Sequence, residues 1–133
     1  MKYLLDTDTV TRVGRGDSQA LLARFGAAAS DQLALSAVTR GEIEFGLLVR
    51  QPKRDTMERM RGLLLQIPTL PLTTQVAAQY SMIRAHLCAA GKPIGFSDLW
   101  IAAHALSEKL IMVTGNERQF RHVPGLKTEN WLT

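Results

Sequence analysis

Apolar and polar positions alternate in blocks along the chain, and these blocks predict strands and helices in turn. Short apolar runs with the composition of buried strands cover residues 2–5, 33–36, 67–70 and 110–114. The stretches between them predict helices near 17–28, 40–50, 54–65, 74–90 and 98–109. Strands that alternate with helices predict an α/β fold, with a central, mostly parallel sheet of about four to five strands flanked by helices.

The best-marked of these helices is the one predicted near 74–90. It begins after Thr73 or Thr74, which are favourable N-cap residues, and it ends before Gly91, with Pro93 just beyond. In such a fold, ligands bind at the carboxyl ends of the strands. Functional acids are therefore expected where strands end and helices begin.

The length of 133 residues predicts a single domain spanning 1–133, because the chain has no repeat, low-complexity tract or linker. No apolar run approaches the ~20 residues that cross a bilayer. The first apolar run meets Asp6 too early for a signal peptide, so we expect a cytoplasmic protein without a membrane partner. The single Cys88 cannot form an internal disulfide, and we expect it to be a small core residue.

A formal net charge of +4 favours a polyanionic partner such as a nucleic acid. The basic residues are placed unevenly, in one group of Arg50, Lys53, Arg54, Arg59 and Arg61 and another of Arg118, Arg121, His122 and Lys127. Each group is also compatible with an ordinary solvated face. Charge alone therefore only slightly favours nucleic-acid binding.

Three acids lie at predicted junctions between strands and helices. Asp6 follows the first strand, Glu42 lies near the start of the helix after the second strand, and Asp98 opens the helix before the fourth. The neighbours of Asp98 at helical spacing are apolar, so its side chain should turn inward, and no basic residue is placed locally to neutralise it. Oxygen ligands from three elements would suit a hard cation such as Mg²⁺.

Each acid also has a purely structural interpretation. Thr39 and Glu42 fit a capping box, Ser97 and Asp98 fit a helix cap followed by an acid that complements the helix dipole, and residues 6–8 fit an Asp-rich turn. Any one of these interpretations is credible by itself. The joint occurrence of the three acids at junctions of one α/β chain favours a metal site.

Four segments in order resemble the VapC branch of the PIN-domain family, almost from end to end. They are residues 3–8 (YLLDTD), 36–46 (SAVTRGEIEFG), 93–105 (PIGFSDLWIAAHA), and a closing part that holds VTGN at 113–116, Phe120, VPGL at 123–126 and Asn130-Trp131. The third segment is the most diagnostic of the family. The correct order and intervals make the resemblance specific.

The resemblance implies a PIN-like three-layer fold and a Mg²⁺- or Mn²⁺-dependent endoribonuclease that acts as the toxin of a toxin–antitoxin pair. It also implies a cognate VapB-like antitoxin, an RNA substrate that resemblance to some members suggests is initiator tRNA, and a homodimer. By position, Asp6, Glu42 and Asp98 correspond to the acidic metal ligands, and Asn116 joins them as a fourth catalytic position.

The chain departs from the family pattern at several of these positions. Asn116 stands where many PIN domains have Asp, and Gln119 stands where near relatives often have an acid, so the fourth carboxylate is replaced by an amide. Asp8 stands where Asn is common. The expected consequence is weaker metal binding, which we expect Mn²⁺ to tolerate better than Mg²⁺.

Other side chains near these acids have structural interpretations at least as good as functional ones. Thr7 and Thr114 could orient a water molecule, but both also suit turns. His104 lies among Ala residues on a helix, and we interpret it as a packing residue or a support of the ligands rather than a catalytic residue.

Two alternatives compete with an active ribonuclease. Asp6-x-Asp8 also matches the opening of haloacid-dehalogenase phosphatases, in which one Asp is the nucleophile and the other an acid/base. That interpretation leaves the segments around Glu42 and Asp98 unexplained. The second alternative is a catalytically weakened PIN subunit that keeps only its binding role.

Overall fold

The first strand of the chain lies in the middle of the sheet. The computed structural model describes residues 1–133 and holds five strands, β1 (Tyr3–Leu5), β2 (Leu33–Ser36), β3 (Thr69–Leu70), β4 (Ile111–Val113) and β5 (Thr128–Glu129). They pair in the order β3-β2-β1-β4-β5, and every pair is parallel. Tyr3 pairs with Leu33 on one side and with Ile111 on the other. The predicted α/β fold is confirmed, with β5 as an addition that the apolar pattern did not predict.

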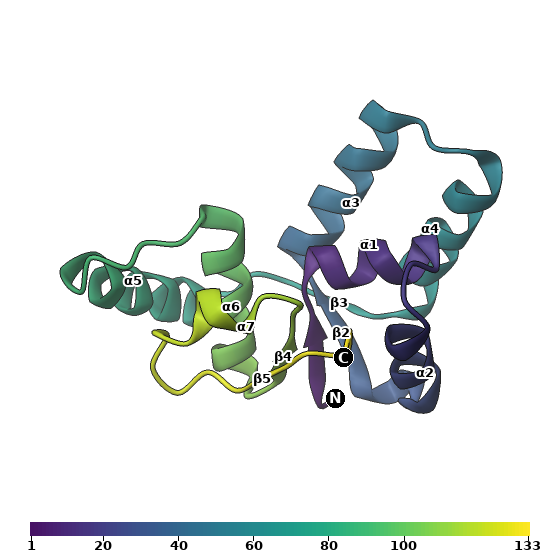
Figure 1. Cartoon of the computed structure of the whole chain (residues 1–133). Coiled ribbons are helices and arrows are strands. Elements are labelled where there is room, and N and C mark those ends of the chain that lie inside the picture. Colours follow the sequence, from purple (N-terminus) through teal and green to yellow (C-terminus); the bar gives the residue numbers. More distant parts are fainter.

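Helices cover both faces of this sheet (Figure 1). They are α1 (Thr7–Arg15), α2 (Gln19–Ala27), α3 (Ala37–Arg50), α4 (Arg54–Gln66), α5 (Thr74–Ala89), α6 (Phe96–Glu108) and the short α7 (Glu117–Phe120), with one 3-10 turn at Ser30–Gln32. Helices α1 to α4 lie on one side and α5 to α7 on the other, which gives three layers. None of the helices is both long enough and apolar enough to cross a membrane.

Alternate residues of the central strands fill two separate cores. Leu4 and Met112 belong to the core under α5 and α6, whereas Leu5 and Val113 belong to the core under α1, α3 and α4. Successive side chains of a strand point to opposite faces, so a sheet covered on both faces needs apolar residues at every position. All four of these side chains are fully buried.

Helix α1 was not predicted, because its sequence TDTVTRVGR has few strong helix formers. Two local features and one contact from α4 compensate. The Asp6 side chain caps its first turn by accepting from the Thr9 amide at 2.8 Å, Gly16 ends it in the left-handed region with φ of 72°, and Arg59 Nε of α4 donates to the Gly14 carbonyl at 2.8 Å. The carboxylate expected in the site therefore also starts a helix.

Two helices begin earlier than predicted, which corrects two of the structural interpretations. Ser36 caps α3, so Glu42 lies in the second turn and the capping box from Thr39 is wrong. Gly95 is the N-cap of α6, so Ser97 is not a cap, although Asp98 does lie in the first turn.

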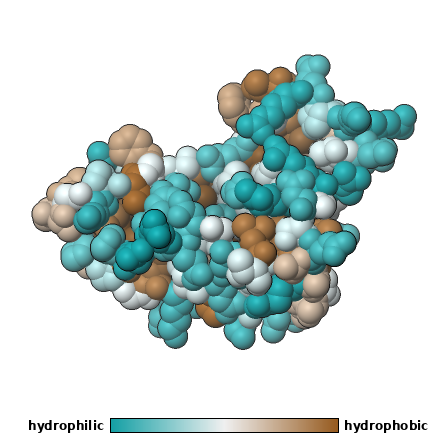
Figure 2. Space-filling view, viewed as in Figure 1, coloured by the Kyte–Doolittle hydropathy of each residue, from teal (hydrophilic) through white to brown (hydrophobic).

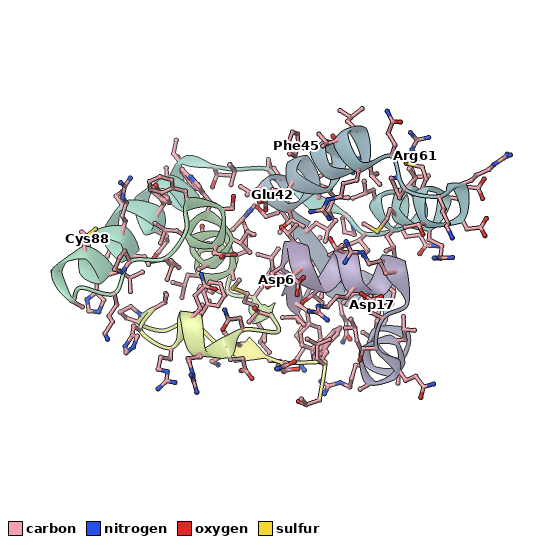
Figure 3. All side chains as sticks on the ribbon, turned by 45° about the horizontal axis from the view of Figure 1, so that its top comes forward. Asp6, Asp17, Glu42, Phe45, Arg61 and Cys88 are labelled. Carbon is pink, nitrogen blue, oxygen red and sulfur yellow. The ribbon has the colours of Figure 1, made fainter.

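The prediction for α5 is correct at both ends, while that for Cys88 is wrong. Thr73 caps the helix by accepting from the Val76 amide, and Gly91 follows it with φ of 68°. Cys88 is exposed at the far end of α5 (Figure 3) rather than buried in the core.

Candidate active site

Asp6 lies at the carboxyl end of the central strand. Its carboxylate is buried, with 6% of the residue exposed, and Oδ1 accepts from the Thr9 amide. Burial raises the pKa of Asp6 above its ordinary value, while hydrogen bonds from Thr9 and Thr114 lower it and the charge of Asp8 raises it. The protein therefore holds a carboxylate here at an electrostatic cost.

Glu42 reaches the same edge of the sheet from α3. Its Oε1 accepts a hydrogen bond from Thr7 Oγ1 at 2.7 Å, which joins the first turn of α1 to the second turn of α3. Thr7 also contacts Thr39 through their hydroxyl oxygens at 3.3 Å. Figure 3 shows Asp6 and Glu42 in the central part of the molecule, between the two groups of helices.

Asp98 enters from α6, on the opposite side of the sheet. Its Oδ2 accepts from Gln119 Nε2 at 2.9 Å, and Gln119 Oε1 in turn accepts from Asn116 Nδ2 at 2.9 Å. The predicted neighbours of Asp98 at helical spacing, Ile101, Ala102 and Ala105, are fully buried. Asn116 thus contacts Gln119 rather than Asp98 itself.

Glu42 and Asp98 share one cavity, which Asp6 does not line, and neither of them has a cationic partner. Glu42, Asp8 and Asp98 line this cavity together with Arg15 and Arg50. None of the five ion pairs of the protein includes Asp6, Glu42 or Asp98, whereas Asp8 pairs with Arg12 at 2.8 Å.

Burial raises the pKa of Asp98. The Gln119 hydrogen bond lowers it, and the charges of Glu42 and Asp8 raise it. The negative charges of Glu42 and Asp8 therefore disfavour the ionised form of Asp98.

Comparison with known proteins explains this arrangement. The family model for the PIN domain matches residues 3–126 of the chain. The chain belongs to the PIN-domain family.

The relatives of this PIN domain are VapC proteins of similar length. It is 35% identical over 132 residues to ribonuclease VapC2 of Haemophilus influenzae, with 99% of both chains covered. It is 30% identical over 131 residues to the tRNA(fMet)-specific endonuclease VapC of Salmonella typhimurium, with 98% of both covered.

Solved structures show the same fold. The DNA-bound VapBC structure from Salmonella typhimurium aligns with a TM-score of 0.90 at 30% identity over 98% of both chains. VapBC-1 from nontypeable Haemophilus influenzae aligns with a TM-score of 0.87 at 26% identity over all of both chains. The predicted membership of the VapC branch is confirmed.

Neither alternative to a VapC-type PIN domain is favoured by these findings. The relatives are named as ribonucleases and endonucleases rather than as phosphatases or inactive subunits. Asp8, on which the phosphatase alternative depends, is an exposed residue in the first turn of α1 and is bonded to Arg12.

The oxygen atoms at the site are of the chemical type that binds hard divalent cations. All are carboxylate oxygens that repel one another, and a cation would relieve that repulsion. No group of three or more His, Cys, Asp and Glu side chains is arranged to hold a metal ion in this structure. Mg²⁺ commonly binds through one or two carboxylates together with water and substrate phosphate oxygens, and the carboxylates of this PIN domain fit that mode.

Sequence reasoning did not identify the contacts that hold these acids in place. Thr7 was expected to orient water or to form a turn, yet it donates to Glu42, and Gln119 was expected to replace an acid, yet it donates to Asp98. The spacing of Asn116 and Gln119 on one short turn was the signal available for their mutual contact, but nothing local pointed to Asp98.

His104 is a packing residue, in agreement with its interpretation from sequence. It is fully buried, and its Nδ1 lies 2.8 Å from Ser36 Oγ. Burial lowers the pKa of His104, so the ring is neutral at pH 7. Because Ser36 also caps α3, this contact joins the helix that carries Asp98 to the one that carries Glu42.

Proposed function

We propose that this protein is a VapC-type toxin, an endoribonuclease that hydrolyses RNA phosphodiester bonds with a divalent cation and is neutralised by a cognate antitoxin. The observation that carries the proposal is that Glu42 from α3 and Asp98 from α6 line one cavity, together with Thr7 directly after Asp6, and that none of the three acids is paired with a cationic side chain. Structural carboxylates of comparable burial are normally paired, so unpaired acids at a strand edge point to a ligand.

In this proposal Asp6, Glu42 and Asp98 bind Mg²⁺, for which Mn²⁺ substitutes, either directly or through bound water, and Asn116 supports them as the fourth catalytic position. Bound there, the cation would polarise a phosphate oxygen and lower the pKa of a bound water. Thr7 keeps the Glu42 carboxylate directed toward the cavity. Arg15 and Arg50, which line the same cavity, would contact phosphates of the RNA strand.

Initiator tRNA is the substrate to test first. Relatives from Salmonella typhimurium and Shigella flexneri, at 30% and 32% identity, are named tRNA(fMet)-specific endonucleases. We propose the same substrate for this chain, because the similarity to those relatives extends over 98% of its length.

An apolar surface patch on α3 and α4 supports the antitoxin part of the proposal. The exposed side chains of this patch are Phe45, Leu48, Val49 and Leu65. Figure 2 shows apolar atoms on the surface where α3 lies. Exposed apolar patches mark protein contacts, and the similar solved structures are VapBC complexes. We propose that a VapB-like antitoxin covers the patch.

The test is a cleavage assay on purified, antitoxin-free protein with initiator tRNA and an elongator tRNA. Cleavage of the initiator tRNA is expected with Mg²⁺ or Mn²⁺ and not with EDTA. Failure of all RNA substrates at millimolar Mn²⁺ would overturn the proposed activity. The homodimer and the cytoplasmic location stay predictions, and light scattering on the purified chain tests the first of them.

A further inference from the structure

The amide of Gln119 has its orientation fixed by its two neighbours. Asn116 Nδ2 donates to Gln119 Oε1, and Gln119 Nε2 donates to Asp98 Oδ2, each at 2.9 Å. An ionised carboxylate can only accept, so Gln119 must turn its NH₂ group to Asp98 and its oxygen to Asn116, which then donates to that oxygen. The direction of donation therefore runs from Asn116 through Gln119 to Asp98.

Backbone hydrogen bonds hold the start of this relay, the chain of hydrogen bonds from Asn116 through Gln119 to Asp98. The backbone N–H of Asn116 donates to Thr114 Oγ1 at 3.1 Å, directly after β4. The backbone N–H of Gln119 donates to the backbone carbonyl of Asn116 at 3.2 Å. Thr114 is buried. The relay thus links the end of a central strand to a carboxylate that lies on a different helix.

We propose that Gln119 is a positioning residue that holds the Asp98 carboxylate in place before a cation binds, with Asn116 holding the other end of its side-chain amide. The proposal rests on the proposed function, in which Asp98 is a metal ligand. Without the hydrogen bond, the like charges of Glu42 and Asp8 would push Asp98 away.

An amide at 119 acts differently from an acid at that position. Glu at 119 would place a second carboxylate against Asp98 with no proton to donate, and the two would need a cation between them. Compared with Glu, Gln119 lacks the negative charge but donates a hydrogen bond to Asp98 in the metal-free protein. An acid restored at 119 should therefore strengthen metal binding, whereas one restored at 116 should not.

The experiment measures Mn²⁺ binding to metal-free protein by electron paramagnetic resonance, without RNA. Q119A should bind Mn²⁺ about tenfold more weakly than the wild type, as is typical when a residue supporting a ligand is lost. Q119E should bind more tightly, because it adds a charge. N116D should bind no more tightly than N116A, because the carboxylate that it introduces would accept from the Gln119 amide and turn the Gln119 oxygen toward Asp98.

A second measurement tests the relay with no metal present. In EDTA, Q119A should lower the melting temperature more in the wild-type background than in a D98A background, since the hydrogen bond to Asp98 exists only in the first while the one from Asn116 is lost in both. Equal shifts in both backgrounds, or equal Mn²⁺ affinity of Q119A and the wild type, would overturn the positioning role alone. N116D that gains affinity as Q119E does would also overturn it.

The outcomes separate this inference from the proposed function. If the wild type binds no Mn²⁺, both the metal-dependent function and the role of Gln119 fail. If the variants bind Mn²⁺ in the expected order but the wild type cuts no RNA, the proposed ribonuclease activity fails and the positioning role stands.

Discussion

Asp6 serves two purposes that pull its pKa in opposite directions. As the N-cap of α1 it accepts from the Thr9 amide, which favours the ionised form, while its burial favours the neutral form. Burial is the larger effect, so the net shift is upward. The pKa of Asp98 is subject to the same two opposing effects: burial raises it, and the hydrogen bond from Gln119 lowers it. Both acids are therefore a source of instability in the metal-free protein.

Asp98→Asn tests whether this carboxylate is kept for activity rather than for stability. The substitution removes a negative charge beside Glu42 and Asp8, so the melting temperature should stay the same or rise. RNase activity should fall by about 100-fold or more, because a cation ligand is lost. As a control, Ile101→Ala in the same helix should cost about 2–5 kcal/mol, as measured by denaturant unfolding. Full activity in Asp98→Asn would contradict the metal site.

The pH dependence of stability follows from the upward pKa shifts of Asp6 and Asp98. An acid whose pKa is higher in the folded state than in the unfolded state loses stability as pH rises from about 4 through its folded pKa. In EDTA, Asp6→Asn should therefore be more stable than the wild type at pH 7, and the difference should shrink as the pH falls toward 4. Thermal unfolding across this range measures it. A difference that grows at low pH would contradict the shift.

At the scale of elements, the sequence predicted the strands and long helices well, and the short or atypical elements poorly. The runs at 33–36 and 110–114 are apolar enough to identify as strands, because both faces of the sheet are covered. Helix α1 was not predicted, because its Thr and Val residues have low helix propensity. It forms because Asp6 caps it and Val10 and Val13 are buried in the core.

The acids of the site were predictable, but the contacts that orient them were not. An acid at a strand end is visible in one local stretch, as with Asp6. The contacts from Thr7 to Glu42 and from Gln119 to Asp98 span 35 and 21 residues, so they depend on how whole helices pack. No local pattern encodes such a distance.

Close packing of α1 on α4 leads to a prediction about glycine. A methyl group at Gly14 would overlap the Met60 side chain of α4, whereas one at Gly26 in α2 would meet nothing. Gly14→Ala should therefore destabilise the protein by about 1–3 kcal/mol, while Gly26→Ala should stabilise it by about 0.5–1 kcal/mol. Denaturant unfolding measures both. Equal effects of the two would show that α1 and α4 are not in close contact.

The apolar patch on α3 and α4 gives a prediction about neutralisation. Leu48 and Leu65 are 76% and 85% exposed, so Asp at either position should leave the fold and the ribonuclease unchanged. Burying that charge against a partner is unfavourable, and the antitoxin should then inhibit about 100-fold less well. Inhibition assays with Leu22→Asp on α2 as the control test this. Unchanged inhibition of both variants would place the antitoxin elsewhere.

At the scale of the whole molecule, the acids of the site and Lys2 lie at opposite ends of the strands. The acids lie at the carboxyl ends of the strands, where Arg15 and Arg50 border the same cavity. Lys2 lies at the opposite end, directly before β1. An RNA strand that enters the cavity would therefore place its phosphates near the two arginines.

The ionic strength dependence of cleavage should report these phosphate contacts. If Arg15 and Arg50 neutralise roughly two phosphates, KM should rise by about tenfold between roughly 50 and 200 mM salt. Arg50→Ala should raise KM and leave kcat unchanged. It should also reduce the slope of log KM against log salt concentration by about one, the value for one lost phosphate contact. Lys2→Ala should change neither. Equal effects of the two substitutions would indicate general charge attraction instead of a defined path.

The strand order also sets when during translation the site can exist. The ribosome makes β1 first, yet β1 is the central strand, and its neighbour β4 lies more than 100 residues later. A chain released before residue 98 lacks Asp98, and one released before residue 111 leaves β1 unpaired on one side. Ribosomes translating this message therefore carry no assembled hydrolytic site until the last part of the chain has emerged.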